Sequence, residues 1–170
     1  MLSIHTLTSP LGVLRLATFE GRLAALDYEE FEDRFQTLLA KRFAGAPHHA
    51  SDPPQGLRAA LDAYFDGQPA LVAGLRLEER GSAFEMRVWS QLRIVGYGQT
   101  ASYTTIAERI GTPQGARAVG RANGLNPIAI VTPCHRIVAA SGALTGYAGG
   151  LWRKEWLLRH EQAHPTPASR

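Results

Sequence analysis

The residues best suited to chemistry are Cys134 and His135, which are adjacent in Pro133-Cys134-His135-Arg136. Cys134 is the single cysteine of the 170-residue chain. A thiol attacks only as its thiolate, and an ordinary cysteine with a pKa of about 8.5 is mostly protonated at neutral pH. An imidazole nearby can accept that proton, so the pair indicates nucleophilic catalysis. The alternative is that a lone cysteine is a small buried apolar residue.

Two elements must position these groups. The run Pro127 to Val138 is rich in β-branched residues and bounded by prolines, which predicts a short buried strand that delivers the thiol. Consecutive side chains of a strand point in opposite directions, so adjacency alone does not place His135 against Cys134. Glu161 follows the apolar positions of a final helix at helical spacing, which places a carboxylate beside that helix's apolar edge. The alternative for Glu161 is a surface carboxylate.

Upstream of the thiol, the sequence predicts a helix over residues 83–93 with Ser82 as its N-cap, followed by two short helices. Ser102 is a suitable N-cap for a helix that ends at Gly111 and Pro113, and a turn through Gly115 leads to a second helix over residues 116–125. Two short helices joined by a glycine-containing turn form the pattern of a helix-turn-helix.

The second helix places two arginines and two glycines on one face: Arg117, Gly120, Arg121 and Gly124. An interior glycine costs about 1 kcal/mol relative to alanine, so two on one face indicate close approach of a ligand backbone. Close helix packing is the alternative, and the arginines favour nucleic acid. The face lacks the long polar side chains with which helix-turn-helix regulators read bases in the major groove.

Charge is unequally distributed along the chain. Residues 1–81 carry 8 basic and 11 acidic residues, whereas residues 82–170 carry 10 and 4. The basic second half is the part expected to face a polyanion. The first ten residues lack a basic n-region, and no apolar run approaches the ~20 residues of a membrane span. With one cysteine and no internal disulfide, these features predict a cytoplasmic protein.

The N-terminal half reads as a small sheet with helices. Strands are predicted over residues 2–7, 13–18 and 22–28 as an antiparallel meander. Amphipathic helices follow over residues 31–43 and 57–65.

The segments between and after these helices carry no catalytic pattern. Residues 45–56 are predicted to be a loop, and its His48, His49 and Asp52 are expected to be solvated, so we assign no metal site. Residues 71–77 are predicted to form another strand. Residues 78–81 are a linker, which divides the chain into an N-terminal α/β supporting domain, 1–81, and a C-terminal domain, 82–170.

Several linked motifs resemble the O6-alkylguanine-DNA alkyltransferases. They cover most of residues 82–161 and are Ser102-Tyr103, residues 116–120, Asn126-Pro127, residues 133–136, Gly142, Gly146, Tyr147, Gly149, Gly150, residues 154–158 and Glu161. The resemblance implies an α+β fold with a ribonuclease H-like N-terminal domain and a mainly helical C-terminal domain that contains the helix-turn-helix.

The resemblance also implies a function. Such a protein flips O6-alkylguanine, and also O4-alkylthymine, out of duplex DNA and transfers the alkyl group irreversibly to its own cysteine in a single-turnover SN2 reaction. It uses no cofactor. It binds the minor groove of double-stranded DNA as a monomer that can cluster on DNA, and does not bind membranes.

Residue roles follow from the same resemblance. The catalytic residues are Cys134, His135, Glu161 and Asn126, with a water bridging the thiol and the imidazole, and Asn126 tying two backbones together. Residues implied to contact substrate are Tyr103, Tyr147, Ala148, Ile137 and Lys154. Residues implied to contact DNA are Arg117, which fills the gap in the base stack, and Ala116, Gly120, Arg121 and Gly124.

The chain departs from the family pattern at three positions, and one role stays open. Ala148 stands where serine is common, Ala129 replaces a frequent proline, and Gly96 lies where a stiffer residue is usual. Arg136 either holds the turn or faces phosphate.

Three rival functions remain. A non-catalytic lesion sensor of this fold would lack Cys134, a transcription regulator has no use for Cys134, His135 and Glu161, and a Cys/His/Glu hydrolase has no use for the arginine-glycine helix.

Overall fold

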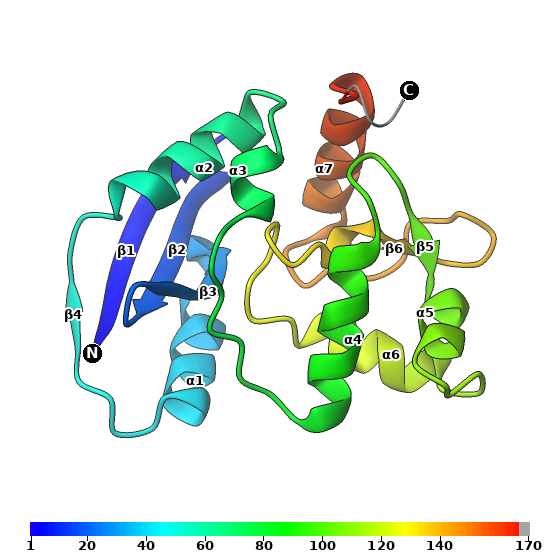
Figure 1. Ribbon diagram of the computed structural model, residues 1–170, viewed down its shortest axis with the longest axis horizontal. Helices are drawn as coiled ribbons and strands as arrows, with labels where there is room; N and C mark the ends of the chain where they lie inside the picture. The colour runs from blue at the N-terminus through cyan, green and yellow to red at the C-terminus, as the bar shows by residue number, and fades with distance from the viewer. Residues whose placement is uncertain (167–170) are drawn as a thin grey trace. The chain divides into compact units, whose positions relative to one another are not determined.

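The chain folds into two compact units, Met1–Arg80 and Gly81–Arg170 (Figure 1). The computed structural model describes residues 1–166. The predicted domain boundary lies one residue from this division, and the last four residues of the predicted second domain lie outside the described residues. Within residues 1–166, no helix is both long and apolar enough to cross a membrane.

A four-stranded sheet forms the centre of the first unit. The three predicted strands are present as β1 (Leu2–Ser9), β2 (Gly12–Phe19) and β3 (Arg22–Tyr28), paired antiparallel. A fourth strand, β4 (His48–Ala50), pairs parallel to β1 and gives the order β3-β2-β1-β4. The prediction of a plain loop was therefore wrong at His48–Ala50. Its three residues are all exposed, so no alternation of apolar and polar side chains marks the strand.

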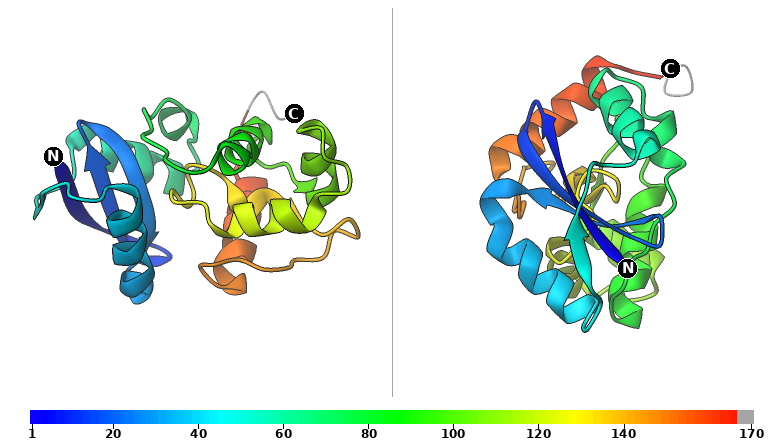
Figure 2. Two further views of the ribbon diagram at one scale, coloured as in Figure 1. Left: turned by 90° about the horizontal axis from the view of Figure 1, so that it is seen from below. Right: turned by 90° about the vertical axis from the view of Figure 1, so that its left-hand side faces the viewer.

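Helices cover this sheet. After the 3-10 turn η1 (Glu29–Phe31) come α1 (Glu32–Arg42), α2 (Gln55–Phe65) and the short α3 (Ala70–Ala73). Phe35 and Leu39 of α1 pack on Ile4 and Ala17 of the sheet, and Figure 2 shows both longer helices lying along it. The first two helices were predicted correctly.

The strand predicted over residues 71–77 was wrong. Residues 70–73 are helical, and Gly74 caps that helix. Only Leu77 makes a β-bridge, to Leu23. The apolar residues of this segment therefore come from a helical turn and one extended residue, which a run of hydrophobic letters cannot distinguish from a strand.

The second unit is mainly helical. Its elements are α4 (Ala83–Ile94), β5 (Ala101–Ser102), α5 (Tyr103–Arg109), α6 (Ala116–Gly124), η2 (Cys134–Arg136), β6 (Ile137–Val138) and α7 (Leu151–Ala163). Ser82 and Glu85 form a capping box at the start of α4, and the Ser102 hydroxyl accepts the Thr105 N–H at the start of α5. Both N-caps are those predicted from the sequence.

The central helix α4 holds the end of α6. Trp89 of α4 is fully buried and donates its indole N–H to the carbonyl of Ala122 at 2.8 Å. Val88, Leu92 and Val119 complete the apolar contact between the two helices. The C-terminal end of α6, from which the chain leads to Cys134, is thus anchored by a buried hydrogen bond as well as by apolar packing.

The buried strand predicted over residues 127–138 was wrong over most of its length. Residues 127–132 form a turn, Cys134 begins the 3-10 helix η2, and only Ile137–Val138 is a strand, which pairs parallel with β5. Ile130 in the turn has φ +70°, a conformation that β-branched residues rarely adopt. The run is buried, as its composition indicates, but hydrogen bonds within the turn and from the side chains of Asn123 and Asn126, rather than a β-ladder, satisfy its backbone.

Candidate active site

Cys134 is enclosed by the apolar core of the second unit. Its side chain is in a cluster with buried residues of α4, α5 and α6, and only 7% of the residue is exposed. Tyr103 and Tyr147 are partly buried and pack against this same cluster, which also contains Ile137. The fold therefore gathers the predicted nucleophile and three residues predicted to contact substrate from three separate segments of the chain.

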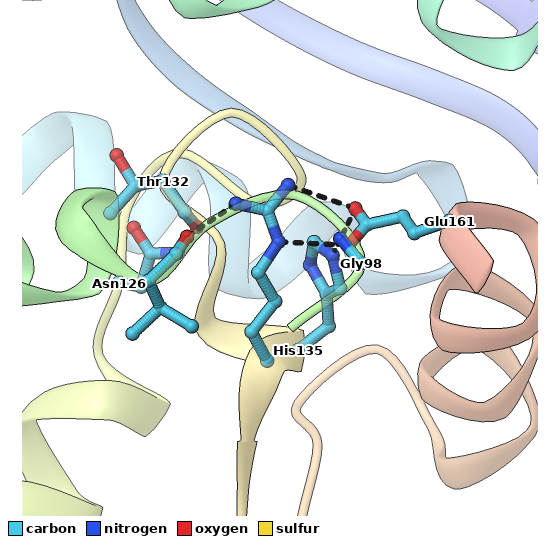
Figure 3. Close-up of polar contacts among 7 residues, drawn as sticks. Gly98, Asn126, Thr132, His135 and Glu161 are labelled. Carbon is cyan, nitrogen blue, oxygen red and sulfur yellow. Dashed lines mark hydrogen bonds and ion pairs between the residues drawn. The ribbon is translucent and has the colours of Figure 1, made fainter. Parts of the chain in front are cut away.

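His135 and Glu161 meet although 26 residues separate them. The imidazole Nε2 lies 2.8 Å from Glu161 Oε2, and neither side chain is exposed. Figure 3 shows Glu161 extending from α7 toward His135. A carboxylate accepts a proton, so this bond selects the tautomer with hydrogen on Nε2 and leaves Nδ1 as an acceptor. Nδ1 has no protein hydrogen-bond partner among residues 1–166.

Arg136 supplies the charge that balances Glu161. Its Nε and one terminal nitrogen donate to the two carboxylate oxygens at 2.8 and 3.0 Å, and the other terminal nitrogen donates to the carbonyl of Val95 at 2.8 Å. Gly98, at φ +77°, contributes an N–H at 3.4 Å from Oε1. Of the two roles left open for Arg136, these contacts match the one that holds the turn.

The electrostatics keep the imidazole neutral. Complete burial lowers the pKa of His135 below its ordinary value of 6.5, and Glu161 only partly opposes this shift. Burial alone would raise the pKa of Glu161, but His135 and Arg136 outweigh it and hold the pKa well below the ordinary value. Glu161 is therefore ionised at neutral pH, while His135 remains a neutral base.

Asn126 organises the turn that leads to Cys134. Its amide nitrogen donates to the carbonyls of Thr132 at 2.7 Å and Ile128 at 3.3 Å, and its oxygen accepts the Ile128 N–H at 3.0 Å. Figure 3 shows Asn126 beside Thr132. The side chain thus ties two parts of the backbone together, which is the geometry expected from the sequence.

Lys154 is a buried ammonium beside the site. Its Nζ donates to the carbonyls of Ile137, Thr145 and Gly146 at 2.5, 2.8 and 3.2 Å, and the residue has no exposed surface. Burial lowers its pKa from 10.5 to about 8, while the charge of the Cys134 thiolate opposes that shift. Lys154 therefore connects the chain after Cys134 to the glycine-rich loop and lies within electrostatic range of the thiol.

The residues predicted to contact DNA occupy the outer face of α6. Arg117, Arg121 and Gly124 are exposed, and Ala116 and Gly120 are partly buried. A β-carbon at Gly120 would lie 3.8 Å from the ring of Tyr103, and one at Gly124 would meet no atom within 4 Å. Gly124 therefore faces open space, which disfavours helix packing as the reason for glycine there.

Two families match the two units of the chain. The one described as 6-O-methylguanine DNA methyltransferase, ribonuclease-like domain, matches residues 2–78. The one described as 6-O-methylguanine DNA methyltransferase, DNA binding domain, matches residues 83–163. A methylated-DNA–protein-cysteine methyltransferase from Salmonella typhimurium is 44% identical over 91% of this chain and 92% of its own length. The chain belongs to this methyltransferase family.

Other members of the methyltransferase family agree with this assignment. A relative of the same name from Mycolicibacterium paratuberculosis is 45% identical over 99% of this chain and 97% of its own length. The crystal structure of Mycobacterium tuberculosis OGT in complex with DNA has a TM-score of 0.78 and 39% identity, covering 97% of this chain and 96% of that one. The chain is therefore an enzyme of the methylated-DNA–protein-cysteine methyltransferase class, with the two-domain fold of these proteins.

The structure of this methyltransferase also reveals residues that the sequence did not point to. Asn123 of α6 is buried and donates its amide to the carbonyl of Cys134 at 3.3 Å. Arg153 of α7 is buried and donates to the carbonyl of Gly149 at 2.8 Å. Both side chains donate to backbone carbonyls. Every residue has such a carbonyl, so no sequence motif identifies Asn123 or Arg153 as a donor to one of them. Ala148, the remaining residue predicted to contact substrate, is exposed.

Proposed function

We propose that this chain repairs duplex DNA by transferring an alkyl group from O6 of guanine, and from O4 of thymine, to Cys134. The observation that carries this proposal is the buried ensemble in which Glu161 binds both His135 and Arg136 beside the only thiol of the chain. The family membership supplies methylated DNA as the class of substrate. Tyr103 and Tyr147, which pack against the cluster that contains the thiol, support a pocket for a flipped base.

The proposed reaction begins with activation of the thiol. His135 is neutral with a free acceptor at Nδ1, so it takes the proton of Cys134, directly or through a bridging water. The imidazolium that forms is stabilised by Glu161 at 2.8 Å. The positive charge of Lys154 favours the thiolate in the same way.

Transfer then proceeds as an SN2 displacement. The thiolate attacks the alkyl carbon, a carbon–sulfur bond forms, and the bond between that carbon and O6 breaks. Guanine leaves with the electron pair of that bond and takes up a proton donated by Tyr147. The thioether that results has no leaving group that water displaces readily, so each molecule reacts once.

Access to the base requires extrusion from the duplex, because O6 lies inside the base stack. We infer that α5 and α6 act as a helix-turn-helix on the minor groove, with Gly120 and Gly124 allowing close approach and Arg121 and the N–H of Ala116 contacting the backbone. Arg117 is exposed and would fill the gap left by the base, while Tyr103 would press on the flipped nucleotide. Extrusion costs a few kcal/mol, roughly the energy of unstacking and unpairing one base.

The loop after Cys134 and the first unit complete the proposed pocket and its support. Ile137 and the N–H of Ala148 would contact the base, and Lys154 would hold the pocket loop. The first unit would serve as a ribonuclease H-like support. We infer that the protein works in the cytoplasm as a monomer that can cluster on DNA.

The proposal is tested by the mass of Cys134. The protein is incubated with duplex DNA carrying one O6-methylguanine, digested, and the peptide with Cys134 is weighed. We expect the mass of one methyl group on Cys134, at most one event per molecule, and no gain in Cys134→Ser, which should still bind DNA. An unmodified Cys134 after loss of the lesion would contradict the proposal, and so would retained transfer by Cys134→Ser.

A further inference from the structure

The turn that precedes Cys134 is attached to the end of α6 by two side-chain amides. Asn126, just after the helix, binds the backbone of Ile128 near the start of the turn and of Thr132 at its last residue. Asn123, within the helix, binds the carbonyl of Cys134 at the end of the turn. These two amides therefore add to the hydrogen bonds that the turn makes within its own backbone, and the contact from Asn123 is the one that comes from α6 itself.

The carbonyl that Asn123 contacts is central to the local geometry. It also accepts the N–H of Ile137, which closes the 3-10 turn η2 that carries Cys134 and His135. A donor placed on this carbonyl controls the orientation of the peptide next to the nucleophile. Movement of the last turn of α6 would thus be passed to the Cys134 carbonyl through this hydrogen bond, beside the apolar packing of Cys134 against α6.

Stability alone does not account for an asparagine at this position. The residue is 6% exposed, and its Oδ1 has no protein hydrogen-bond partner among residues 1–166. A buried acceptor without a partner costs free energy, and an apolar side chain of the same size would avoid that cost. A reversed amide would place Oδ1 against the carbonyl of Cys134, so the orientation is fixed by the contact itself.

The opposite face of the same helix is the one with Arg117, Arg121 and Gly124 exposed. Trp89 meanwhile anchors the carbonyl of Ala122 to α4. A ligand that presses on the outer face therefore acts on a helix whose inner face reaches the nucleophile through Asn123. Asn123 and the exposed Arg121 and Gly124 lie within the same turn of α6.

We propose that Asn123 is a positioning residue that couples engagement of duplex DNA by α6 to the placement of Cys134. This inference rests on the proposed function. The coupling is energetic, so it should change the rate of transfer from duplex DNA more than protein stability or DNA affinity. Asn126 holds the backbone of the turn. Asn123, in contrast, links α6 directly to the carbonyl of Cys134, so that a shift of the helix changes the position of this peptide group.

Asn123→Leu removes the amide and keeps the size of the side chain. We expect single-turnover transfer from duplex DNA to fall about tenfold per folded molecule, a size typical of coupling between linked sites. Reaction with free O6-benzylguanine and affinity for undamaged duplex should stay close to wild type. Val119→Ala serves as the control, because it removes apolar contact on the same buried face of α6 and leaves the Asn123 amide in place. It should lower stability without selective loss on duplex DNA.

A spectroscopic measurement separates coupling from extrusion. Because the chain has one cysteine, [1-13C]cysteine labelling gives a single carbonyl signal, that of Cys134. Undamaged duplex DNA should shift this signal in the wild type and in Arg117→Ala, but not in Asn123→Leu.

Two outcomes would overturn the inference. One is transfer from duplex DNA by Asn123→Leu at the wild-type rate. The other, which needs no variant to fold, is a wild-type carbonyl signal that does not move when DNA saturates the protein. A wild type that never alkylates Cys134 would instead refute the proposed function, while the carbonyl signal would still test the coupling.

Discussion

The two units of this methyltransferase differ in how many polar and charged side chains they bury. In the first unit the buried polar side chains are His5 and Thr18, which bind each other at 2.8 Å. In the described part of the second unit, eight buried residues are polar or charged: Asn123, Thr132, His135, Arg136, Arg153, Lys154, His160 and Glu161. Burial of charge is costly unless each group is paired. Buried polar and charged side chains are thus concentrated in the second unit, which also contains the thiol.

One pair of interactions makes this contrast quantitative. Each unit has an arginine that contacts both oxygens of a glutamate, Arg15 with Glu32 and Arg136 with Glu161. The first pair is 22% and 38% exposed, and the second 11% and 0%. Both pairs have the same chemical groups in contact. A difference in the stability lost when each pair is broken therefore measures the effect of burial.

The largest expected effect is that of Glu161→Gln. It leaves Arg136 buried without its counter-charge, so the free energy of unfolding should fall by about 3–5 kcal/mol. Glu32→Gln, the matched change at the surface pair, should cost about 1 kcal/mol or less. Denaturant titration of both variants tests this difference, and equal losses would show that burial does not distinguish the two units.

Glu161→Gln should also change the rate of transfer and the pH dependence of stability. Without the carboxylate the imidazolium is less favoured, so single-turnover transfer per folded molecule should slow, and unchanged rates would assign Glu161 to stability alone. Both folded-state pKa values are depressed, so wild-type stability should fall as pH drops below 6.5 through His135 and further below 4.5 through Glu161. Glu161→Gln should lack the second loss.

Lys154→Met tests the buried ammonium against Lys41, an exposed lysine of the first unit. Removing the charge near Cys134 should move the pH profile of thiol modification to higher pH by about one pH unit. Lysine in the unfolded chain binds its proton up to about pH 10.5, whereas folded Lys154 releases it at about 8, so wild-type stability should rise between these values. Lys41→Met should reproduce neither effect, and matching profiles for wild type and Lys154→Met would exclude Lys154 from thiol activation.

Arg117→Ala tests whether the outer face of α6 acts in extrusion. We expect transfer from duplex DNA to fall about tenfold, equivalent to about 1.4 kcal/mol, with little change on free O6-benzylguanine, because only the duplex requires a flipped base. Arg58→Ala, which removes the same charge from an exposed position on α2, should leave both rates intact. Equal losses on the two substrates would show that Arg117 does not act in extrusion.

The smallest effect is expected from Gly124→Ala. An added β-carbon meets no atom within 4 Å, so the variant should be more stable by about 0.5–1 kcal/mol through helix propensity. Its affinity for duplex DNA should nevertheless fall, since the methyl group lies on the face that we propose approaches the DNA backbone. Gly56→Ala on α2, where a β-carbon is also unhindered, should stabilise without altering affinity. Undiminished affinity in Gly124→Ala would remove the reason given for glycine at this position.

Local signals in the sequence were sufficient for much of the fold. Strand-like runs between turn residues located β1 to β3, helical spacing of apolar residues located α1, α2, α4 and α5, and the turn through Gly115 located α6. The caps at Ser82 and Ser102 fixed two helix starts. These features depend on residues that lie near one another in the chain. The adjacency of Cys134 and His135 was likewise a local signal, and together with the linked motifs it indicated the family.

Other features were decided by tertiary structure alone. The run before Cys134 has the composition of a strand, yet it forms a turn with its own backbone hydrogen bonds and with contacts from Asn123 of α6 and from Asn126, which follows α6. Arg136 was ambiguous until α7 placed Glu161 against it. A buried backbone carbonyl or a lone carboxylate accepts a donor from any part of the chain, and sequence does not record which donor the fold will bring within reach.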